Sequence, residues 1–564
     1  NNTDARFDFG ANIITPSTSG FALSSSSRVN GNSYTYASWT FRKAPKFFDV
    51  VTYTGNGASG RLIDHNLGSA PGMVTIKSTS TSGTNWSTYH RGLTANNYVI
   101  LNTAAAQAGN GFDRTVSSTQ YELGPNWADE NQNGRTYVAY FFAHNNNDGE
   151  FGPDADQDII KCGSYTGTGN GSTSGPIINL GWEPQWVLLK SKSHTGNWFL
   201  FDTMRGIVTG GKDPILYPDA SAEEEPNYDC LDVNATGFQV TYSGTPMNGN
   251  NETYIYMAIR APMITPPAAA TDVFAMDTSA SSTAQAASPP VQYYAGFPVD
   301  MMLKGSAFNA SGANYSHARL TNGRLSTHAT STETAVADHF DSNQGYRPIS
   351  LSANTNYIAY LFKRAKNYFD VITYSGTGQI QGVLHSLSVV PEMFWVKRRD
   401  SGATSNWIVY HKDLGPTKYI RLNDYQTPIV SSAMWANSDP SATGIVVSNA
   451  TEVNNASGTY IAYLFATLPG ISKVGSVSHS GSSTDVDCGF SAGARFILLK
   501  RIDGNSHWYY WDSLRGIVAG NDPYLVLNNN GAQVTNTDYI DPLSSGFTIT
   551  GDFNDGDYIF YAIA

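Results

Sequence analysis

The sequence predicts an all-β protein built as a tandem array of β-sandwich repeats. One alternating strand pattern recurs along the chain, clearly at 136–142, 356–362 and 459–465 and more loosely at 33–39, 253–259 and 557–563. The leading tyrosines of these copies are 98 to 117 residues apart, which is near the size of a domain and longer than a solenoid unit. Charged residues make up only 14% of the chain. Because no helical period extends beyond two turns, a helical fold is excluded.

The spacing divides the chain into five complete repeats and one partial repeat. The complete ones are expected at 46–147, 157–262, 272–364, 367–467 and 472–564, the third being divergent. FDVVTY and FDVITY mark the first and fourth, and Asp-x-x-Arg-Gly marks the second and fifth, so the chain reads as two copies of a three-repeat unit. Residues 1–45 match only the C-terminal part of a repeat. Since half a sandwich exposes its apolar face, we expect the missing strands before Asn1 or on another chain.

Each repeat shows the same order of elements. A period-two strand and a Gly-rich turn come first, as in FDVVTYTGNG from Phe48. A nearly continuous apolar strand follows and is predicted to be interior and covered; its copies are 71–77, 184–190, 298–304, 391–397 and 494–500. A hairpin, a short strand and the recurring strand complete the repeat. This gives seven or eight strands, the number that a two-sheet sandwich needs.

Four tryptophans occupy one position of the repeat, and each lies four residues before a polar side chain. They are Trp86, Trp198, Trp407 and Trp508, followed by His90, Asp202, His411 and Asp512. In a strand these two positions share a face. The tryptophans could be sugar-stacking platforms, but a Trp repeated at one position is more typical of a buried anchor, which is the interpretation we favour. Tyr315 takes this place in the third repeat.

The Asp-x-x-Arg-Gly motif also allows two interpretations. Asp202 with Arg205, and Asp512 with Arg515, could hold sugar hydroxyls. Alternatively, the Asp accepts backbone N–H groups at a strand-end turn, the Arg pairs with it and the Gly takes positive φ. We favour the turn.

Aromatic residues outside the shared pattern are the candidates for binding a receptor or a glycan. They are Trp127, Trp182, Tyr217, Tyr228 and Trp435. The alternative for each is ordinary packing within a loop.

The sequence gives little support for nucleic-acid binding, membrane insertion, metal binding or catalysis. The net charge of −12 and the lack of a Lys/Arg cluster argue against nucleic acid, and no apolar run approaches membrane-spanning length. Cys162, Cys230 and Cys488 lack zinc or disulfide spacing and are expected to be buried free thiols. Neither Glu223–Glu225 nor the histidines 317, 328 and 339 have metal-ligand spacing. No cofactor motif, acid pair or nucleophile stands out, so we expect a protein that is not an enzyme and has no cofactor or metal.

Three segments resemble a known repeat. They are HNLGSAPGMVTIKSTSTSGTNWSTYHRGL (65–93), NLGWEPQWVLLKSKSHTGNWFLFDTMRGI (179–207) and ASGTYIAYLFA (456–466). The repeat is common in tail-fibre-like and other virion structural proteins of marine tailed phages, especially cyanophages. The resemblance implies jelly-roll-like β-sandwiches of the lectin-like concanavalin or SPRY type. It also implies a role in virion surface structure and host attachment, and it brings no catalytic residues.

The expected function is therefore a non-enzymatic, extracellular virion surface protein of a tailed phage, a tail fibre or adhesin. Its expected partners are other copies of itself, with a trimer favoured, other virion proteins, and a host cell-surface glycan or protein. Three rivals remain: a purely structural virion component such as a capsid decoration or tail shaft protein, a bacterial secreted carbohydrate-binding or surface-layer array, and a depolymerising tailspike. Repetition argues against the enzyme, since catalysis needs one unique constellation.

Overall fold

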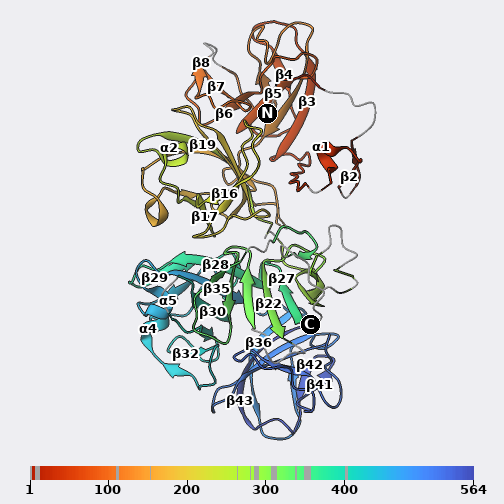
Figure 1. The fold of residues 1–564 in the computed structure, drawn as a ribbon, viewed down its shortest axis with the longest axis vertical. Helices are drawn as coiled ribbons and strands as arrows, with labels where there is room; N and C mark the ends of the chain where they lie inside the picture. The colour runs from red at the N-terminus through yellow and green to blue at the C-terminus, as the bar shows by residue number, and fades with distance from the viewer. Residues whose placement is uncertain are drawn as a thin grey trace.

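The protein is all-β. The computed structural model describes residues 3–6, 13–18, 20–32, 34–109, 114–152, 154–262, 265–279, 281, 283–284, 291–306, 314–336, 340–347, 357–400 and 404–564, so His339 lies outside the described residues. Strands dominate, and every helix with given bounds has only three or four residues. Figure 1 shows an elongated molecule with the first complete repeat at one end and the fifth at the other.

The N-terminal segment (residues 1–45) forms little regular structure. β1 (Ile14–Pro16) and β2 (Phe21–Leu23) pair antiparallel, and α1 (Ser27–Asn30) follows. The described part of 33–39 forms no strand, so the prediction of a sixth copy of the recurring strand is wrong for this structure. In the complete repeats that strand is hydrogen-bonded on both sides. Residues 34–39 have no neighbouring strand, and a lone strand leaves its backbone groups unpaired.

Repeats 1, 3 and 4 (46–147, 272–364 and 367–467) share one topology, a six-stranded main sheet and a two-stranded small sheet. Repeat 1 contains β3 (Phe48–Thr54), β4 (Leu62–Asp64), β5 (Met73–Ser78), β6 (Ser87–His90), β7 (Asn97–Ile100), β8 (Ala108–Gly109), β9 (Gln120–Glu122) and β10 (Thr136–Phe142). Repeat 3 contains η2 (Ala270–Asp272), β20 (Phe274–Thr278), β21 (Tyr293–Tyr294), β22 (Met301–Ser306), β23 (Tyr315–Ala318), β24 (Gly323–Ser326), β25 (Thr334–Ala335), β26 (Gly345–Tyr346) and β27 (Tyr357–Phe362). Repeat 4 contains β28 (Phe369–Ser375), β29 (Gln381–Leu384), β30 (Met393–Arg398), β31 (Ile408–His411), β32 (Lys418–Arg421), β33 (Ile429–Val430), α4 (Ser432–Trp435), β34 (Gly444–Val447), α5 (Thr451–Asn454) and β35 (Thr459–Phe465).

Repeats 2 and 5 (157–262 and 472–564) have a shorter main sheet and a three-stranded small sheet. Repeat 2 contains β11 (Ile160–Thr166), η1 (Ser172–Ser174), β12 (Ile177–Asn179), β13 (Pro184–Ser191), β14 (Trp198–Asp202), β15 (Asp213–Ile215), β16 (Glu225–Tyr228), β17 (Leu231–Asn234), β18 (Gly237–Val240), α2 (Thr245–Asn248) and β19 (Thr253–Arg260). Repeat 5 contains β36 (Ser472–His479), β37 (Thr484–Asp487), β38 (Phe496–Arg501), β39 (Trp508–Asp512), β40 (Tyr524–Val526), β41 (Ile540–Leu543), β42 (Gly546–Ile549) and β43 (Gly556–Ile563).

The recurring strand has the same place in all five complete repeats. As β10, β19, β27, β35 and β43, it lies antiparallel between the first strand of its repeat and the interior apolar strand. The interior strands β5 and β30 are buried at nearly every position, as predicted. In repeat 4 the small sheet packs on one face of the main sheet, so that Val383 and Ile445 share a core with Phe394 and Leu464.

The tyrosine that opens the recurring strand ties the loop before it to the sheet. In repeat 4 the Tyr460 hydroxyl accepts the Asn455 N–H at 2.7 Å and donates to the Thr451 carbonyl at 2.7 Å. Its ring stacks on Tyr374 of the neighbouring strand with centroids 5.1 Å apart. Tyr137 repeats the pattern on Gln132, Ala128 and Tyr53. The recurrence of this Tyr therefore has a structural cause.

All three cysteines are free and buried, as expected from their spacing. Burial raises the pKa of the Cys488 thiol to about 12, which keeps it protonated and unreactive. Among the described residues, no helix combines the length and apolar character needed to cross a membrane.

We predict that Tyr460→Phe lowers the free energy of unfolding by about 1–2 kcal/mol, because a partly buried N–H and a partly buried carbonyl both lose their partner. Chemical denaturation followed by near-UV circular dichroism measures the change. Tyr425→Phe is the matched control, since Tyr425 is 54% exposed. Equal stability of the two variants would contradict the role given to Tyr460.

Candidate interface between repeats

Three of the four shared tryptophans donate a hydrogen bond across a junction between repeats. The acceptor is always a backbone carbonyl on the last residue of a strand in the preceding repeat. The bonds run from Trp198 Nε1 to Ile100 at 3.0 Å, from Trp407 Nε1 to Ser326 at 2.8 Å, and from Trp508 Nε1 to Arg421 at 2.9 Å. All three side chains are at most 1% exposed. The predicted burial is therefore confirmed for these three, but they anchor the junction instead of the core of their own repeat.

Trp86 of repeat 1 differs from the other three. It is half-buried, its ring stacks on Tyr140 at 6.3 Å between centroids, and its indole N–H bonds to no described residue. The burial predicted for Trp86 is therefore not reached in this structure. The contrast shows that a neighbouring repeat is what buries this position.

The tryptophans lie on the face of the main sheet that points away from the small sheet. Trp198 and Leu200 of repeat 2 share a core with Val74 and Phe141 of repeat 1, whereas Phe199 and Phe201 face their own small sheet. In repeats 2, 4 and 5 both faces of the main sheet are therefore covered, one by the small sheet and one by other repeats, whereas the outer face of repeat 1 is only partly buried. This explains why the interior strands are apolar at nearly every position.

Repeats 3, 4 and 5 close into a ring. Repeat 4 bonds to repeat 3 through Trp407, and repeat 5 bonds to repeat 4 through Trp508. Repeat 3 lacks the Trp, but Asn314 Nδ2 donates to the Val526 carbonyl of repeat 5 at 2.9 Å. Val526 ends β40 as Ser326 ends β24, so the acceptor position is the same. One three-repeat unit thus forms a closed body around a shared aromatic core, in which Phe465 contacts Phe362 and Tyr561.

Three of the polar residues four positions after the Trp contact another repeat or the N-terminal segment. His90 Nε2 lies 3.0 Å from the Tyr256 carbonyl of repeat 2. The Asp512 carboxylate accepts the Tyr360 hydroxyl of repeat 3 at 2.7 Å, and Asp202 accepts the Trp39 indole N–H at 3.1 Å. Trp39 of the N-terminal segment thus occupies on repeat 2 the place that Tyr360 occupies on repeat 5.

The Asp-x-x-Arg-Gly motif forms a strand-end turn in both repeats, as favoured from the sequence. Asp202 Oδ1 accepts the Arg205 backbone N–H at 2.9 Å, and its Oδ2 accepts Arg205 Nε at 2.7 Å. Asp512 and Arg515 repeat both bonds at 2.8 and 2.5 Å. Gly206 and Gly516 take φ of 124° and 126°, a region that side chains avoid. The Asp and Arg groups therefore bond mainly to protein and not to solvent.

Burial shifts the pKa values of titratable groups at the junctions. Burial lowers the pKa of His90 and of His411 to about 4. His90 Nδ1 accepts the Gly92 N–H at 3.0 Å, which requires an unprotonated nitrogen. Burial also lowers the pKa of Lys190 and Lys397 to about 8. Their ammonium groups donate to the carbonyls of Ala104 and Thr330 in the preceding repeats.

A separate contact joins repeat 2 to the ring of repeats 3, 4 and 5. The Arg364 guanidinium binds both Glu183 oxygens, at 2.6 and 2.7 Å, and Asp370 at 2.7 Å. Burial opposes its charge, but the carboxylates of Asp370 and Glu183 outweigh this and raise the pKa of Arg364 well above its usual value. Beside it, the Thr209 N–H donates to the Leu320 carbonyl at 2.8 Å.

The five candidate binding aromatics do not form one site. Trp435 is fully buried between Phe394 and Tyr410, and Trp182 is 4% exposed. Neither can stack on a ligand, which corrects the prediction for these two. Trp127 packs edge-on against Tyr98, and Tyr217 packs against Phe199; both are half-buried. Tyr228, 45% exposed, is the one most open to solvent.

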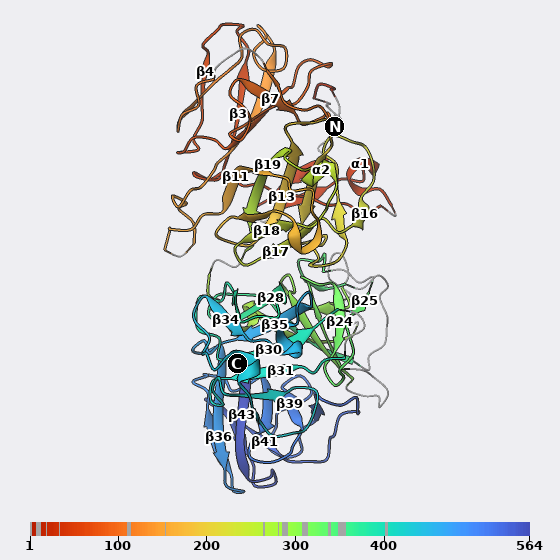
Figure 2. The same ribbon diagram turned by 90° about the vertical axis from the view of Figure 1, so that its left-hand side faces the viewer.

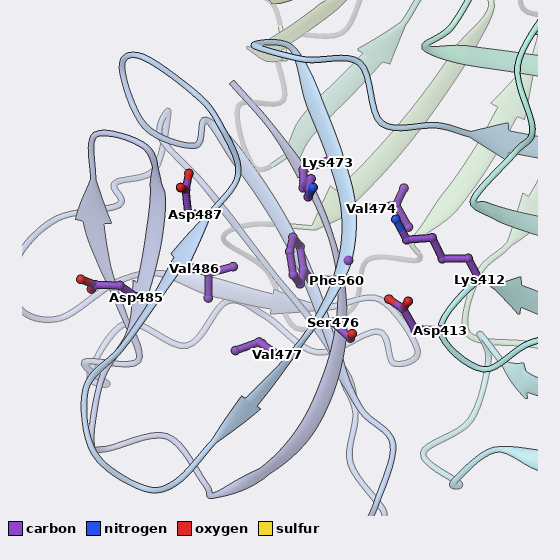
Figure 3. A pocket seen from close by; sticks show the side chains of 11 residues that line it. Lys412, Asp413, Lys473, Val474, Ser476, Val477, Asp485, Val486, Asp487 and Phe560 are labelled. Atoms are coloured by element: carbon purple, nitrogen blue, oxygen red, sulfur yellow. The ribbon is translucent and has the colours of Figure 1, made fainter.

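A pocket of about 360 Å³ opens at the junction of repeats 4 and 5. Figure 3 shows Lys412 and Asp413 on one side of Phe560 and Asp485 and Asp487 on the other. A catalytic or ion-binding site requires charged groups that converge on one point. The charged groups that line this pocket do not converge in this way. In the described part of the chain, no group of three His, Cys, Asp or Glu side chains could hold a metal ion.

We predict that Trp407→Ala lowers the free energy of unfolding by about 3–5 kcal/mol, because it empties a closed junction. Trp86→Ala is the matched control and is expected to cost much less. Thermal and chemical denaturation of the two variants measure the difference, and equal losses would contradict the junction role.

We predict that stability falls between pH 6.5 and 4 because His90 and His411 stay neutral in the folded protein but are protonated when unfolded. Each lowered pKa corresponds to a loss of about 3 kcal/mol in the free energy of unfolding, which is complete near pH 4. Raised pKa values, about 6 at Asp232 and Asp522, act in the opposite direction. We therefore compare the double variant His90→Gln/His411→Gln with the wild type. The measured quantity is the difference between their free energies of unfolding as a function of pH. An unchanged pH dependence would exclude the histidines as its cause.

A comparison with curated proteins finds no match. A family model does match, over residues 1–262 and 353–564, and so omits most of the divergent third repeat. The matched ranges hold the Trp anchors and both Asp-x-x-Arg-Gly turns. With well over half of its length matched, the chain belongs to the family described as Domain of unknown function (DUF7483).

Proposed function

We propose that this protein is a non-enzymatic surface component of a tailed-phage particle, a tail fibre or adhesin that attaches the particle to its host. We also infer that each repeat, with a main and a small sheet around a core, is a jelly-roll-like sandwich of the concanavalin type. The proposal includes self-association, with a trimer favoured, contact with other virion proteins, and an extracellular location.

One observation carries the proposal: residues at the positions that recur in repeats 1, 2, 4 and 5 are used to join repeats. Trp198, Trp407 and Trp508 all bond across a junction, and His90 and Asp512 do the same. Motif residues that build contacts favour an extended, rigid array over a catalyst. Such an array can present many weak binding loops at once, and multivalency then raises the overall affinity.

Recognition is left to segments that differ between repeats, among them β16, which ends at Tyr228. Tyr228 is 45% exposed and packs edge-on against Tyr242, with centroids 5.7 Å apart. An exposed aromatic ring held by a second ring can stack on a sugar without much loss of side-chain freedom. Tyr228 is therefore the residue that we assign to glycan contact.

A purely structural role, as a capsid decoration or tail shaft protein, is the second candidate. The burial of Trp182 and Trp435 favours it, because two of the five candidate binding aromatics have no surface to offer. The two roles predict different behaviour towards host cells.

We predict that the purified protein binds host cells and blocks phage adsorption without releasing sugar. Binding should survive high salt, since the net charge of −12 repels anionic envelopes and leaves stacking and hydrogen bonds as the driving forces. Tyr228→Ala should weaken binding by about tenfold or more, a loss typical of an aromatic anchor. Tyr425→Ala, which removes another exposed ring on repeat 4, is the matched control.

Three results would count against the proposal. Release of reducing sugar from host polysaccharide would indicate a depolymerase. No effect on adsorption, with the protein located on the capsid or tail shaft, would favour the structural role. Equal binding by the Tyr228 and Tyr425 variants would remove Tyr228 from the site.

A further inference from the structure

The turn that follows Asp202 joins the two halves of the molecule. Its residues 203–210 pack against repeats 3 and 4. The Thr209 N–H donates to the Leu320 carbonyl at 2.8 Å, and Arg399 Nη2 donates to the Thr209 carbonyl at 3.0 Å. Val208 is buried there, with 7% of its surface exposed. This contact is the internal example of one three-repeat unit docking on the next.

Repeat 5 carries the same turn, at residues 513–520, and in the described structure the side chains of Leu514, Val518 and Ala519 on it are exposed. Its shape is preformed: the Val518 N–H donates to Asp522 at 2.9 Å, as the Val208 N–H donates to Asp213 at 2.8 Å. Yet Val518, the counterpart of Val208, is 47% exposed, and Leu514 is 49% exposed. Two neighbouring apolar side chains on a rigid turn are typical of an interaction surface.

The surface that receives the turn also has an uncovered counterpart. In repeat 4, Thr373 on β28 is covered, and its hydroxyl lies 3.0 Å from that of Thr209. The matching residue on β3 of repeat 1, Thr52, is exposed. Beside it, Lys43 binds Asp49 at 2.9 Å, as Arg364 binds Asp370 at 2.7 Å. The Lys43 side chain is 60% exposed, whereas Arg364 also binds Glu183 of repeat 2.

The segments beside the two uncovered surfaces differ in charge; in repeat 5 the Asp522 carboxylate accepts both the Val518 N–H of the turn and the Ile540 N–H of the neighbouring segment. Residues 34–46 contain Arg42, Lys43 and Lys46 and no acidic residue. Residues 530–560 of repeat 5 contain five Asp residues and no Lys, Arg or His. The internal contact has the same polarity, with Glu183 on the turn side and Arg364 and Arg399 on the receiving side. Opposite charges steer two surfaces together and fix their orientation.

Repeat 1 and repeat 5 lie at opposite ends of the molecule in both views (Figures 1 and 2). We propose that residues 513–520 of one molecule dock on β3 and the neighbouring Lys43 of a second copy, so that molecules associate head to tail. Each contact uses two different surfaces and leaves one of each free, so the assembly grows as a linear chain. The proposal does not depend on the virion role.

The contact between copies should be weaker than the internal one. Ala519 stands where repeat 2 has Thr209, and Gly493 stands where it has Glu183, so the Thr–Thr contact and the ion pair across the junction are lost. We therefore expect reversible association that depends on protein concentration and weakens as salt is raised.

Sedimentation velocity of the full-length protein over a range of concentration tests the proposal. Wild type should form a series of growing oligomers. Val518→Glu and Thr52→Glu should each weaken association by about tenfold or more, because each places a charge in the contact. Both sites are exposed, so neither change should unfold the protein. Val430→Glu is the matched control, since Val430 is 73% exposed on repeat 4.

Mixing the two defective variants gives the decisive result. Val518→Glu keeps an intact repeat 1 surface, and Thr52→Glu keeps an intact turn, so an equimolar mixture should form dimers and nothing larger. Three results would overturn the proposal: a wild type that stays monomeric at all concentrations, association of wild-type strength in either variant, or a mixture that forms no dimer.

Discussion

A buried indole N–H needs an acceptor, and for three of the shared tryptophans the acceptor belongs to a different repeat. Trp198, Trp407 and Trp508 each reach the carbonyl that ends a strand of the repeat before. Strand ends are where backbone carbonyls lose their ladder partners, so one bond satisfies two groups that burial would otherwise leave unpaired. The relative placement of the repeats follows from this pairing.

Because the outer faces of the main sheets in repeats 2, 4 and 5 are covered by other repeats, these repeats depend on their neighbours for burial. Trp198 shares a core with residues of repeat 1, and Phe465 of repeat 4 packs on Tyr561 of repeat 5. A single repeat cut from this array would expose a large apolar face, which soluble monomers rarely do. The three-repeat unit, and not the single repeat, is therefore the natural structural unit in the ring of repeats 3, 4 and 5.

The same arrangement accounts for the unusual number of buried polar groups. His90, Asp512 and Lys397 all lie at junctions, where each finds a partner on a neighbouring repeat. A buried polar group that is paired in only one arrangement penalises every other arrangement. These residues thus define how the repeats meet.

The sequence by itself determined the all-β class, the period of about 100 residues, the covered interior strand and the Asp-x-x-Arg-Gly turn, because these depend on local alternation and turn chemistry. It also indicated that the shared tryptophans are buried. Only the tertiary structure decided what buries them, why Trp86 differs, and that Trp182 and Trp435 are core residues. Each of these depends on contacts between segments far apart in the chain, and residue type alone does not distinguish a face packed on its own repeat from one packed on a neighbour. The same limit applies to residues 34–39, whose strand pattern lacks the neighbouring strands that would make it a strand.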